Sequence, residues 1–498
     1  MARRRGLAAA FLLVAVAIGA ALTAGAPAAR QRALSPWLET AMRQARAGGT
    51  LAVWIYFADK GDAASAAGGG SAATARAAAR RAARGASTPR TRFEDRPLAA
   101  RYVSRVAALA TRVRQQSRWL NAMSVEATPS QIADIAALSF VARVDVVRRY
   151  RRLREEGVTA LDEPGPGRRS GAQRAADDPL DYGAGIDQVR QIRVPELHQR
   201  GLHGESVVVA VFDSGFPNLT HEAFALTTVL AERDFVDGRD SVRESSDAHG
   251  TNTLSTLGGF APGQLIGPAY AASFILAVTE DVRSETPVEE DNWAAAAEWA
   301  EALGADVISS SLGYLDFDLP YTSYTAADMN GEVAVTTRAA AMAAERGVVV
   351  VSSAGNAGFD PSSNTLGAPA DGVRVVSVGA VTRTGARAGF SSVGPTADGR
   401  IKPDVVAMGV NVKVARHFEN AYGVASGTSF SCPLTAGVVA LILQAHPEYT
   451  PDDVLTVLRA SASQAGAPDT LLGWGIVDAV AAVDMPLPTP ALAASRRP

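Results

Sequence analysis

The sequence predicts an α/β protein in which a central parallel sheet is flanked by helices and preceded by a small α+β domain. Two observations lead to this prediction. Continuous apolar runs alternate with helical stretches after residue 206, and a different pattern of strands and helices fills residues 35–150. The 498 residues suffice for one large domain and at least one smaller one.

The large domain is predicted from apolar runs of the kind that strands buried on both faces produce. These runs lie at residues 207–212, 272–278, 305–311, 348–353 and 373–381. The helices expected between them stop near Gly304 and Gly347, as C-terminal caps require. Helices between strands indicate parallel crossovers. We therefore expect one layered domain over residues 181–484 and a short tail at 485–498.

The small domain over residues 35–150 has mixed periodicity. Its predicted elements are a strand at 51–57, a loose and partly helical insert at 61–97, a helix at 102–113, a strand from 117, a helix opened by Thr128-Pro129 and a strand at 141–150. The following residues 151–180 are rich in Pro, Gly and Arg, and they suit a linker that contains a proteolytic processing site.

Residues 1–28 have the three parts of a secretory signal peptide. Arg3, Arg4 and Arg5 precede an apolar run at 7–22 and the small-residue site Ala26-Pro27-Ala28. The alternative is an uncleaved membrane anchor, but the run is short for a spanning helix, which needs about 20 residues. We expect export to the periplasm, the cell surface or the medium, without a stable membrane anchor.

Charge and cysteine content exclude some classes of partner and bond. The formal net charge of -3 gives no global field that would recruit nucleic acid. Cys432 is the only cysteine, so an intrachain disulfide is impossible. We interpret Cys432 as a small buried hydrophobe, and a thiol-sensitive site is the alternative.

Candidate chemical groups follow predicted strands or open predicted helices. Asp213 follows the run at 207–212, and Asn356 follows the run at 348–353. His249 and Ser429 each stand at the start of a predicted helix. Each motif alone is weak, because an aspartate or serine in such a place is often only a helix cap. Ligands of open parallel sheets nevertheless gather at the carboxyl ends of the strands.

Together these motifs resemble the subtilase family of serine peptidases, from about Asp181 to Ala482. The chain order Asp213, His249, Ser429 is the subtilisin order, and a subtilisin-like fold is implied. The resemblance implies that Ser429 is the nucleophile, His249 its general base and Asp213 the residue that orients the imidazole. It also implies that the Asn356 amide and the Ser429 backbone N–H stabilise the oxyanion.

The resemblance extends to the substrate site and to the small domain. It implies that the backbone of Ser311, Leu312 and Gly313 pairs with an extended protein or peptide substrate. Ala354 and Gly355 are also expected to bind substrate, and the small, uncharged residues Gly355 and Ala357 suggest a pocket for large apolar side chains on the acyl side of the scissile bond. The small domain resembles the inhibitory propeptide of many subtilases. We expect it to act as an intramolecular inhibitor of a monomeric, secreted, self-processing endopeptidase.

The chain departs from the family pattern after two of its motifs. Thr253, Leu254 and Ser255 replace the usual Val-Ala-Gly, and Phe430 replaces the usual Met after the nucleophile. Catalysis is expected to need no cofactor. A structural calcium ion is common in the family, but no Asp-rich loop identifies its ligands here.

Two other classes of function remain open from the sequence. A catalytically silent scaffold would lose at least one triad or oxyanion residue, and all four are present. A surface adhesin would carry a long β-rich tail after the catalytic domain, whereas the residues after Ala482 are few and rich in Pro and Ala.

Overall fold

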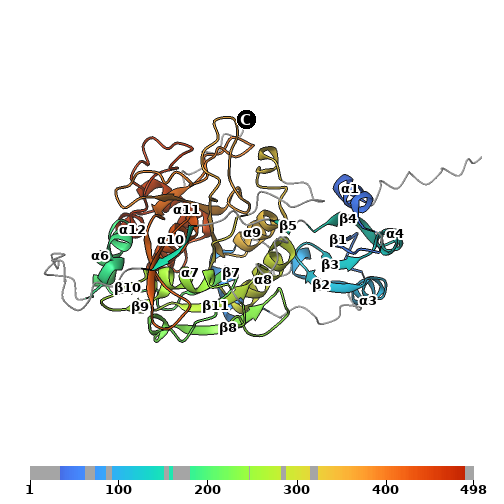
Figure 1. Ribbon diagram of the computed structural model, residues 1–498, viewed down its shortest axis with the longest axis horizontal. Coiled ribbons are helices and arrows are strands. Elements are labelled where there is room, and N and C mark those ends of the chain that lie inside the picture. The colour runs from blue at the N-terminus through green and yellow to red at the C-terminus, as the bar shows by residue number, and fades with distance from the viewer. Residues whose placement is uncertain are drawn as a thin grey trace, which may run out of the picture.

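The structure is a computed structural model with two packed units (Figure 1). It describes residues 34–46, 48–61, 73–85, 92–147, 149–150, 156–160, 180–245, 247–281, 288–313 and 324–487. Only the backbone is described at 149–150, 156–160 and 288–289. The expected signal peptide, most of the expected linker and most of the expected tail lie outside these residues.

The N-terminal unit is a four-stranded sheet in the order β2-β3-β1-β4. Its strands are β1 (Leu51–Phe57), β2 (Arg112–Ser117), β3 (Ala122–Ala127) and β4 (Val141–Val146), and its helices are α1 (Pro36–Gln44), α3 (Ala100–Ala107) and α4 (Pro129–Ala136). The pairings of β1 with β3 and β4 are antiparallel. The sheet and helices confirm the predicted α+β class of this unit.

Both faces of β1 are buried, and this explains its unbroken apolar sequence. Val53 and Ile55 pack in the core of the N-terminal unit itself. Trp54 and Tyr56 point to the opposite face, where they share a hydrophobic cluster with helices of the second unit. The side chains alternate between the two faces because successive residues of a strand point in opposite directions.

Three local predictions in this unit need correction. The expected helix at 102–113 ends at Ala107, and β2 already begins at Arg112. In the insert expected to be loose and partly helical, the helical part is confirmed as α2 (Ala75–Arg84), but this helix is capped and its arginines bind the second unit. The strand expected at 141–150 is divided, since β4 ends at Val146 and β5 (Arg149–Tyr150) pairs with β12 (Val288–Glu289) instead.

The second unit is built on a seven-stranded sheet in the order β16-β15-β14-β13-β7-β11-β8, and all of its pairings are parallel. The strands are β7 (Val208–Asp213), β8 (Thr228–Asp234), β11 (Ser273–Val278), β13 (Val307–Ser310), β14 (Val349–Ser353), β15 (Val375–Val381) and β16 (Val405–Met408). The predicted parallel sheet is therefore confirmed, with β8 and β16 as strands that the sequence did not reveal.

Helices cover both faces of this sheet. Val209 and Val211 of β7 face a cluster that contains residues of α7 (His249–Gly258) and α10 (Thr428–Ala445). Ala210 and Phe212 face the other way, toward α8 (Glu290–Leu303) and α9 (Val335–Glu345). Since Trp54 and Tyr56 of β1 belong to this second cluster, the N-terminal unit docks on α8 and α9.

Smaller elements complete the second unit. They are α5 (Ile186–Arg190), α6 (Val194–Gln199), α11 (Pro451–Ser461), α12 (Ala479–Asp484), the pair β9 (Phe260–Ala261) and β10 (Leu265–Ile266), and the sheet of β17 (Val412–Ala415), β18 (Tyr422–Ser426) and β6 (Glu156–Ala160). One helix, α10, is long and apolar enough to cross a membrane, but 89% of it is buried inside the protein. It is therefore the core helix of this unit.

Candidate active site

Asp213 and His249 meet at the carboxyl end of the central strand. Asp213 is the last residue of β7, and His249 is the first residue of α7. His249 Nδ1 lies 2.6 Å from Asp213 Oδ1, which also accepts a 2.8 Å hydrogen bond from the Ser214 backbone N–H. Both side chains are buried, with Asp213 0% and His249 6% exposed. The carboxylate thus holds the imidazole with its Nδ1 edge turned inward.

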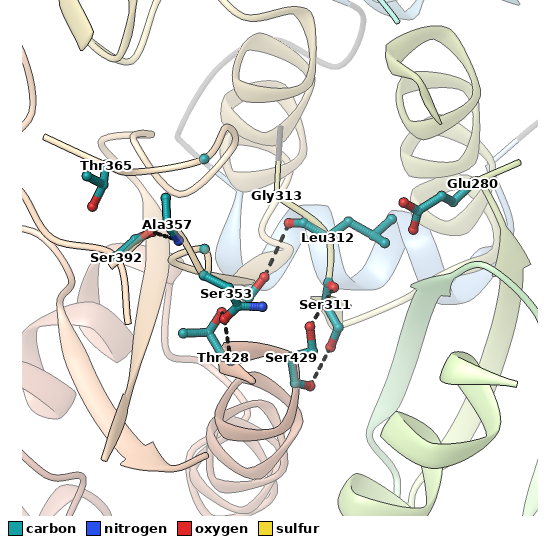
Figure 2. Close-up of a pocket in the computed structure, with 13 residues that line it drawn as sticks. Glu280, Ser311, Leu312, Gly313, Ser353, Ala357, Thr365, Ser392, Thr428 and Ser429 are labelled. Carbon is teal, nitrogen blue, oxygen red and sulfur yellow. Dashed lines mark hydrogen bonds between the residues drawn. The ribbon is translucent and has the colours of Figure 1, made fainter. Parts of the chain in front are cut away.

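Ser429 lies in the first turn of α10, where it is fixed against the end of β13. Its Oγ donates a 3.1 Å hydrogen bond to the Ser311 carbonyl oxygen, and Ser311 Oγ donates a 2.9 Å bond to the Ser429 carbonyl oxygen (Figure 2). The turn that separates β18 from α10 depends on Gly427, whose φ of 155° and ψ of 156° are suited to glycine alone. This sharp turn sets Ser429 at a helix N-terminus, where developing negative charge is favoured.

The helices α7 and α10 bring His249 and the Ser429 turn together. The ring of Phe430, the residue after Ser429, packs edge-on against the His249 ring with 5.7 Å between centroids. Phe430, which stands where the family usually has methionine, therefore packs directly against the imidazole ring of His249.

Asn356 is positioned from the end of β14 by the same turn of α10. Its Oδ1 accepts hydrogen bonds from both the backbone N–H and the Oγ1 of Thr428, each 2.9 Å long. These two bonds orient the amide group. Its oxygen faces Thr428, and its donor atom is Nδ2. Asn356 and Ser429 line one pocket.

The pocket contains most of the substrate-binding residues that the sequence predicted. Ser311, Leu312, Gly313 and Gly355 line it, whereas the fully buried Ala354 does not. Ala354 N instead donates to the Val378 carbonyl oxygen, which ties the end of β14 to β15. Ala357, which the sequence suggested as a pocket residue, also lines the pocket. The other lining residues, beside Asn356 and Ser429, are Glu280, Ser353, Thr365, Gly367, Ser392 and Thr428.

Glu280 is the charged member of the pocket lining that sequence reasoning missed. It stands two residues after β11, and Figure 2 shows it at the opposite end of the pocket from Thr365. Its position after an apolar run was the one signal available in the sequence. A carboxyl group there gives this end of the pocket a polar character.

Cys432 lies below the site and is shielded from it. It is 0% exposed, and its thiol lies 3.5 Å from the carbonyl oxygens of Ser310 and Val351. Burial raises the pKa of Cys432 to about 12, so the group remains a thiol at neutral pH. The interpretation of Cys432 as a small buried hydrophobe is confirmed.

Within the part of the chain that the structure describes, no group of three or more His, Cys, Asp and Glu side chains is arranged to hold a metal ion. Calcium also takes backbone carbonyl and side-chain amide oxygens as ligands, so a calcium site does not require such a cluster.

Two stretches of the chain match known protein families. Residues 204–475 match the Subtilase family, and residues 52–160 match the peptidase S8 propeptide domain of Bacteroidota. The first match covers the parallel sheet and the pocket, and the second covers the four-stranded sheet. The order of the two matches along the chain is that of a propeptide followed by a catalytic domain.

Individual relatives agree with these matches. Subtilisin NAT from Bacillus subtilis subsp. natto is 32% identical over 295 residues, which are 59% of this chain and 70% of that protein. Subtilisin from Bacillus pumilus is 31% identical over 295 residues, which are 97% of its length. Both relatives therefore align with this chain over most of their own sequences.

The fold also resembles that of fervidolysin from Fervidobacterium pennivorans, described as a keratinolytic enzyme related to subtilisin. The TM-score is 0.61 at 22% identity, and the match covers 89% of this chain and 62% of fervidolysin. The chain thus spans less than two thirds of that protein. The chain belongs to the subtilase family, whose members are serine endopeptidases, and it carries the family's propeptide domain ahead of the catalytic domain.

Proposed function

We propose that the chain is exported as a self-processing precursor and hydrolyses peptide bonds through Asp213, His249 and Ser429. The observation that carries this proposal is the 2.6 Å contact between His249 Nδ1 and Asp213 Oδ1 beside the first turn of α10. The ring of His249 packs against Phe430, the neighbour of Ser429. Membership of the subtilase family supports the same assignment.

In this mechanism the imidazole of His249 acts first as a general base and then as a general acid. His249 Nε2 takes the proton of the Ser429 hydroxyl as Oγ bonds to the scissile carbonyl carbon, and then gives it to the amine as the C–N bond breaks. The resulting ester on Ser429 is hydrolysed by water, which the same imidazole deprotonates. Before the attack, Ser429 Oγ must turn from its bond with the Ser311 carbonyl oxygen toward His249.

The oxyanion of the tetrahedral intermediate is proposed to lie between Asn356 and the start of α10. The bonds from Thr428 to Oδ1 orient the Asn356 amide, whose donor is Nδ2. The Ser429 backbone N–H belongs to the first turn of α10. Two such donors stabilise charge that appears only in the transition state.

The substrate is proposed to be an extended protein or peptide segment that pairs with Ser311–Gly313. These residues continue β13 into the pocket, where a Cβ atom at Gly313 would lie 3.8 Å from the Gly355 Cα and 3.9 Å from the Gly367 Cα. Gly355 and Ala357 keep the pocket wall small and uncharged. We propose a preference for large apolar residues on the acyl side of the scissile bond.

The N-terminal domain is proposed to inhibit the catalytic domain in the same chain. Its sheet covers α8 and α9 through the cluster that includes Trp54, and its polar groups bind the carboxylates of α8. Arg114 Nε lies 2.9 Å from Asp291 Oδ2, and the backbone N–H of Trp119 donates a 3.2 Å bond to Glu298.

Helix α2 adds a second group of contacts with the catalytic domain. Arg81 Nε donates a 2.7 Å hydrogen bond to Glu301, and Arg84 Nη1 lies 3.0 Å from Asp306 Oδ1. Arg80 donates to the carbonyl oxygens of Ala305 and Arg346, at the C-terminal ends of α8 and α9. Cations are favoured at these ends by the helix dipoles. Such contacts support a domain that stays bound after its peptide link is cut.

Export and assembly are further parts of the proposal. The signal-peptide pattern of residues 1–28 supports translocation, and the processing site is proposed to lie within 151–180. The mature enzyme is proposed to act as a secreted or periplasmic monomer that needs no cofactor for catalysis.

The experiment that tests this function is a comparison of Ser429→Ala with wild type. We expect the wild type to separate into two bands on a denaturing gel, with peptidase activity that phenylmethylsulfonyl fluoride abolishes. Ser429→Ala should remain full length and inactive. The matched control is Ser431→Ala, another buried serine of α10, whose Oγ donates to the Thr428 carbonyl oxygen of its own helix.

A stable full-length wild type without activity would instead support a silent scaffold. Cleavage by Ser429→Ala at the wild-type rate would contradict the assignment of the nucleophile.

A further inference from the structure

Thr253 places a hydroxyl group on the second oxygen of the Asp213 carboxylate. Its Oγ1 lies 2.8 Å from Asp213 Oδ2, and both residues are fully buried. Thr253 stands four residues after His249 in α7, so the two side chains lie on the same face of that helix. One helix therefore supplies hydrogen-bond partners to both oxygens of the carboxylate.

The hydroxyl has two acceptors within reach, and the carboxylate is the better one. The alternative is the Gly250 carbonyl oxygen at 3.2 Å, an ordinary contact of a threonine with its own helix. The bond to Asp213 is shorter, and a charged acceptor makes a stronger hydrogen bond than a neutral carbonyl. We therefore take Thr253 Oγ1 as a hydrogen-bond donor to Asp213 Oδ2.

The sequence of α7 shows why this contact is particular to the chain. Position 253 is one of the three at which the family's usual Val-Ala-Gly is replaced, and threonine has almost the shape of valine. The replacement keeps the branched side chain and exchanges one methyl group for a hydrogen-bond donor. It therefore changes the electrostatics behind the imidazole with little change in volume.

We propose that Thr253 is a positioning residue, which fixes the Asp213 carboxylate and moderates its attraction for the His249 imidazolium. This inference rests on the proposed function, in which His249 is the general base. A donor on Oδ2 draws negative charge away from Oδ1, where His249 binds. His249 consequently loses its proton at a lower pH than it would beside a carboxylate without this donor.

Other polar and charged groups near His249 and Asp213 do not replace the hydrogen bond from Thr253 Oγ1 to Asp213 Oδ2. Asp247 Oδ1 accepts a 3.0 Å bond from the His249 backbone N–H, and Glu280 lines the pocket. Ser214 donates to Asp213 Oδ1 from both its N–H and its Oγ, at 2.8 and 3.2 Å. Thr253 is the group that holds Oδ2, so its removal should allow the carboxylate plane to turn.

The test compares Thr253→Val with Thr253→Ser and with Thr256→Val. Thr253→Val should lower kcat about tenfold, since hydrogen bonds to charged groups contribute this much or more. KM should stay within about twofold, because Thr253 does not line the substrate pocket. The acid limb of the pH–rate profile should move to higher pH by about half a unit or more. Thr253→Ser keeps a hydroxyl group, so the acid limb of its pH–rate profile should match that of the wild type.

Thr256→Val is the matched control. Thr256 is another fully buried threonine of α7, but its Oγ1 donates to the Asn252 carbonyl oxygen and not to Asp213. This variant should keep the wild-type pH profile. An equal change in both valine variants, or none in Thr253→Val, would overturn the inference.

A second measurement separates this inference from the proposed function. The proton on His249 Nδ1 is followed by ¹H NMR in the inactive Ser429→Ala precursor, with and without Thr253→Val. We expect the valine variant to raise the pH at which His249 titrates. An unchanged titration would contradict the role of Thr253 even if Ser429 proves to be the nucleophile. Activity retained by Ser429→Ala would contradict the proposed function alone.

Discussion

Arg80 of α2 and Glu301 of α8 form an ion pair that water does not reach, with side chains that are 2% and 0% exposed. The pair joins the propeptide domain to the catalytic domain, more than 200 residues apart in the chain. Arg81 binds the same carboxylate from the next position of α2. The cations that compensate Glu301 thus belong to the propeptide domain: Arg80 and Arg81 of α2, and Arg118 at 3.9 Å.

Removal of this carboxylate should release the processed propeptide. In Glu301→Gln, Arg80 is left buried without its counter-charge, and breaking one partner of a buried pair costs about 3–5 kcal/mol. We expect the cleaved propeptide to co-elute with the wild-type catalytic domain in size-exclusion chromatography at low salt, and to separate from it in Glu301→Gln. Arg112→Met is the control, since Arg112 pairs with Glu126 inside the propeptide domain. Equal retention in both variants would refute this role of α2.

The pH dependence of propeptide binding should follow Glu298. Burial raises the pKa of this carboxyl to about 7 in the docked state, although Ser117, Arg118 and the Trp119 N–H act in the opposite direction. A raised pKa in the bound state means that binding is strongest below the ordinary pKa of about 4.5, and that this contribution is lost as the pH rises through about 7. We expect the propeptide to dissociate more readily at pH 8 than at pH 5.

The measurement is the dissociation constant of the processed complex at constant ionic strength between pH 5 and pH 8. Glu298→Gln should flatten the profile, because the amide does not titrate. A wild-type profile that is already flat, or that tightens with rising pH, would count against Glu298.

Loss of the Asn356 amide should slow turnover without weakening substrate binding. Asn356→Ala is expected to lower kcat by about 10²–10³, the magnitude found for the oxyanion asparagine of a subtilisin. KM should change little, since the donor acts on charge present only in the transition state. Steady-state kinetics with a peptide substrate provide the measurement. Asn330→Ala is the control, since Asn330 does not line the pocket and its Oδ1 accepts a 2.9 Å bond from the Glu332 backbone N–H. A loss confined to KM would disagree with an oxyanion role.

Thiol reagents should leave the native enzyme active. Because burial raises the pKa of Cys432 to about 12, the reactive thiolate does not form at pH 8. Iodoacetamide should label Cys432 in guanidinium chloride but not in buffer, as mass spectrometry of the intact chain can report. Rapid labelling and inactivation of the folded enzyme would contradict this expectation.

The central sheet could be predicted from sequence where strands are buried on both faces. The edge strand β8 escaped prediction because it runs through Glu232 and Arg233 and has no unbroken apolar run. β16 has only four residues, Val405–Met408, and forms the other edge of the sheet. Propensity and periodicity cannot identify elements whose stability comes from neighbours distant in the chain.

The same limit explains what was missed around the site and in the propeptide domain. The residues of the proposed triad stand in motifs, so a chemical role could be proposed for each of them from sequence. The contact of Thr253 with Asp213 depends on how α7 crosses β7, and no local pattern encodes that crossing. The insert that contains α2 was expected to be loose and only partly helical, because its alanines and arginines form an ordered face only beside Glu301 and Asp306.

The arginine contacts across α8 also change how the overall charge should be understood. Residues 34–150 contain 18 Lys and Arg against 8 Asp and Glu, whereas residues 181–498 contain 19 against 37. The near-neutral precursor thus consists of a basic propeptide domain packed on an acidic catalytic domain. Once they part, the enzyme should bind an anion-exchange resin more tightly than its precursor does, and polyanionic surfaces should repel it while they retain the discarded propeptide.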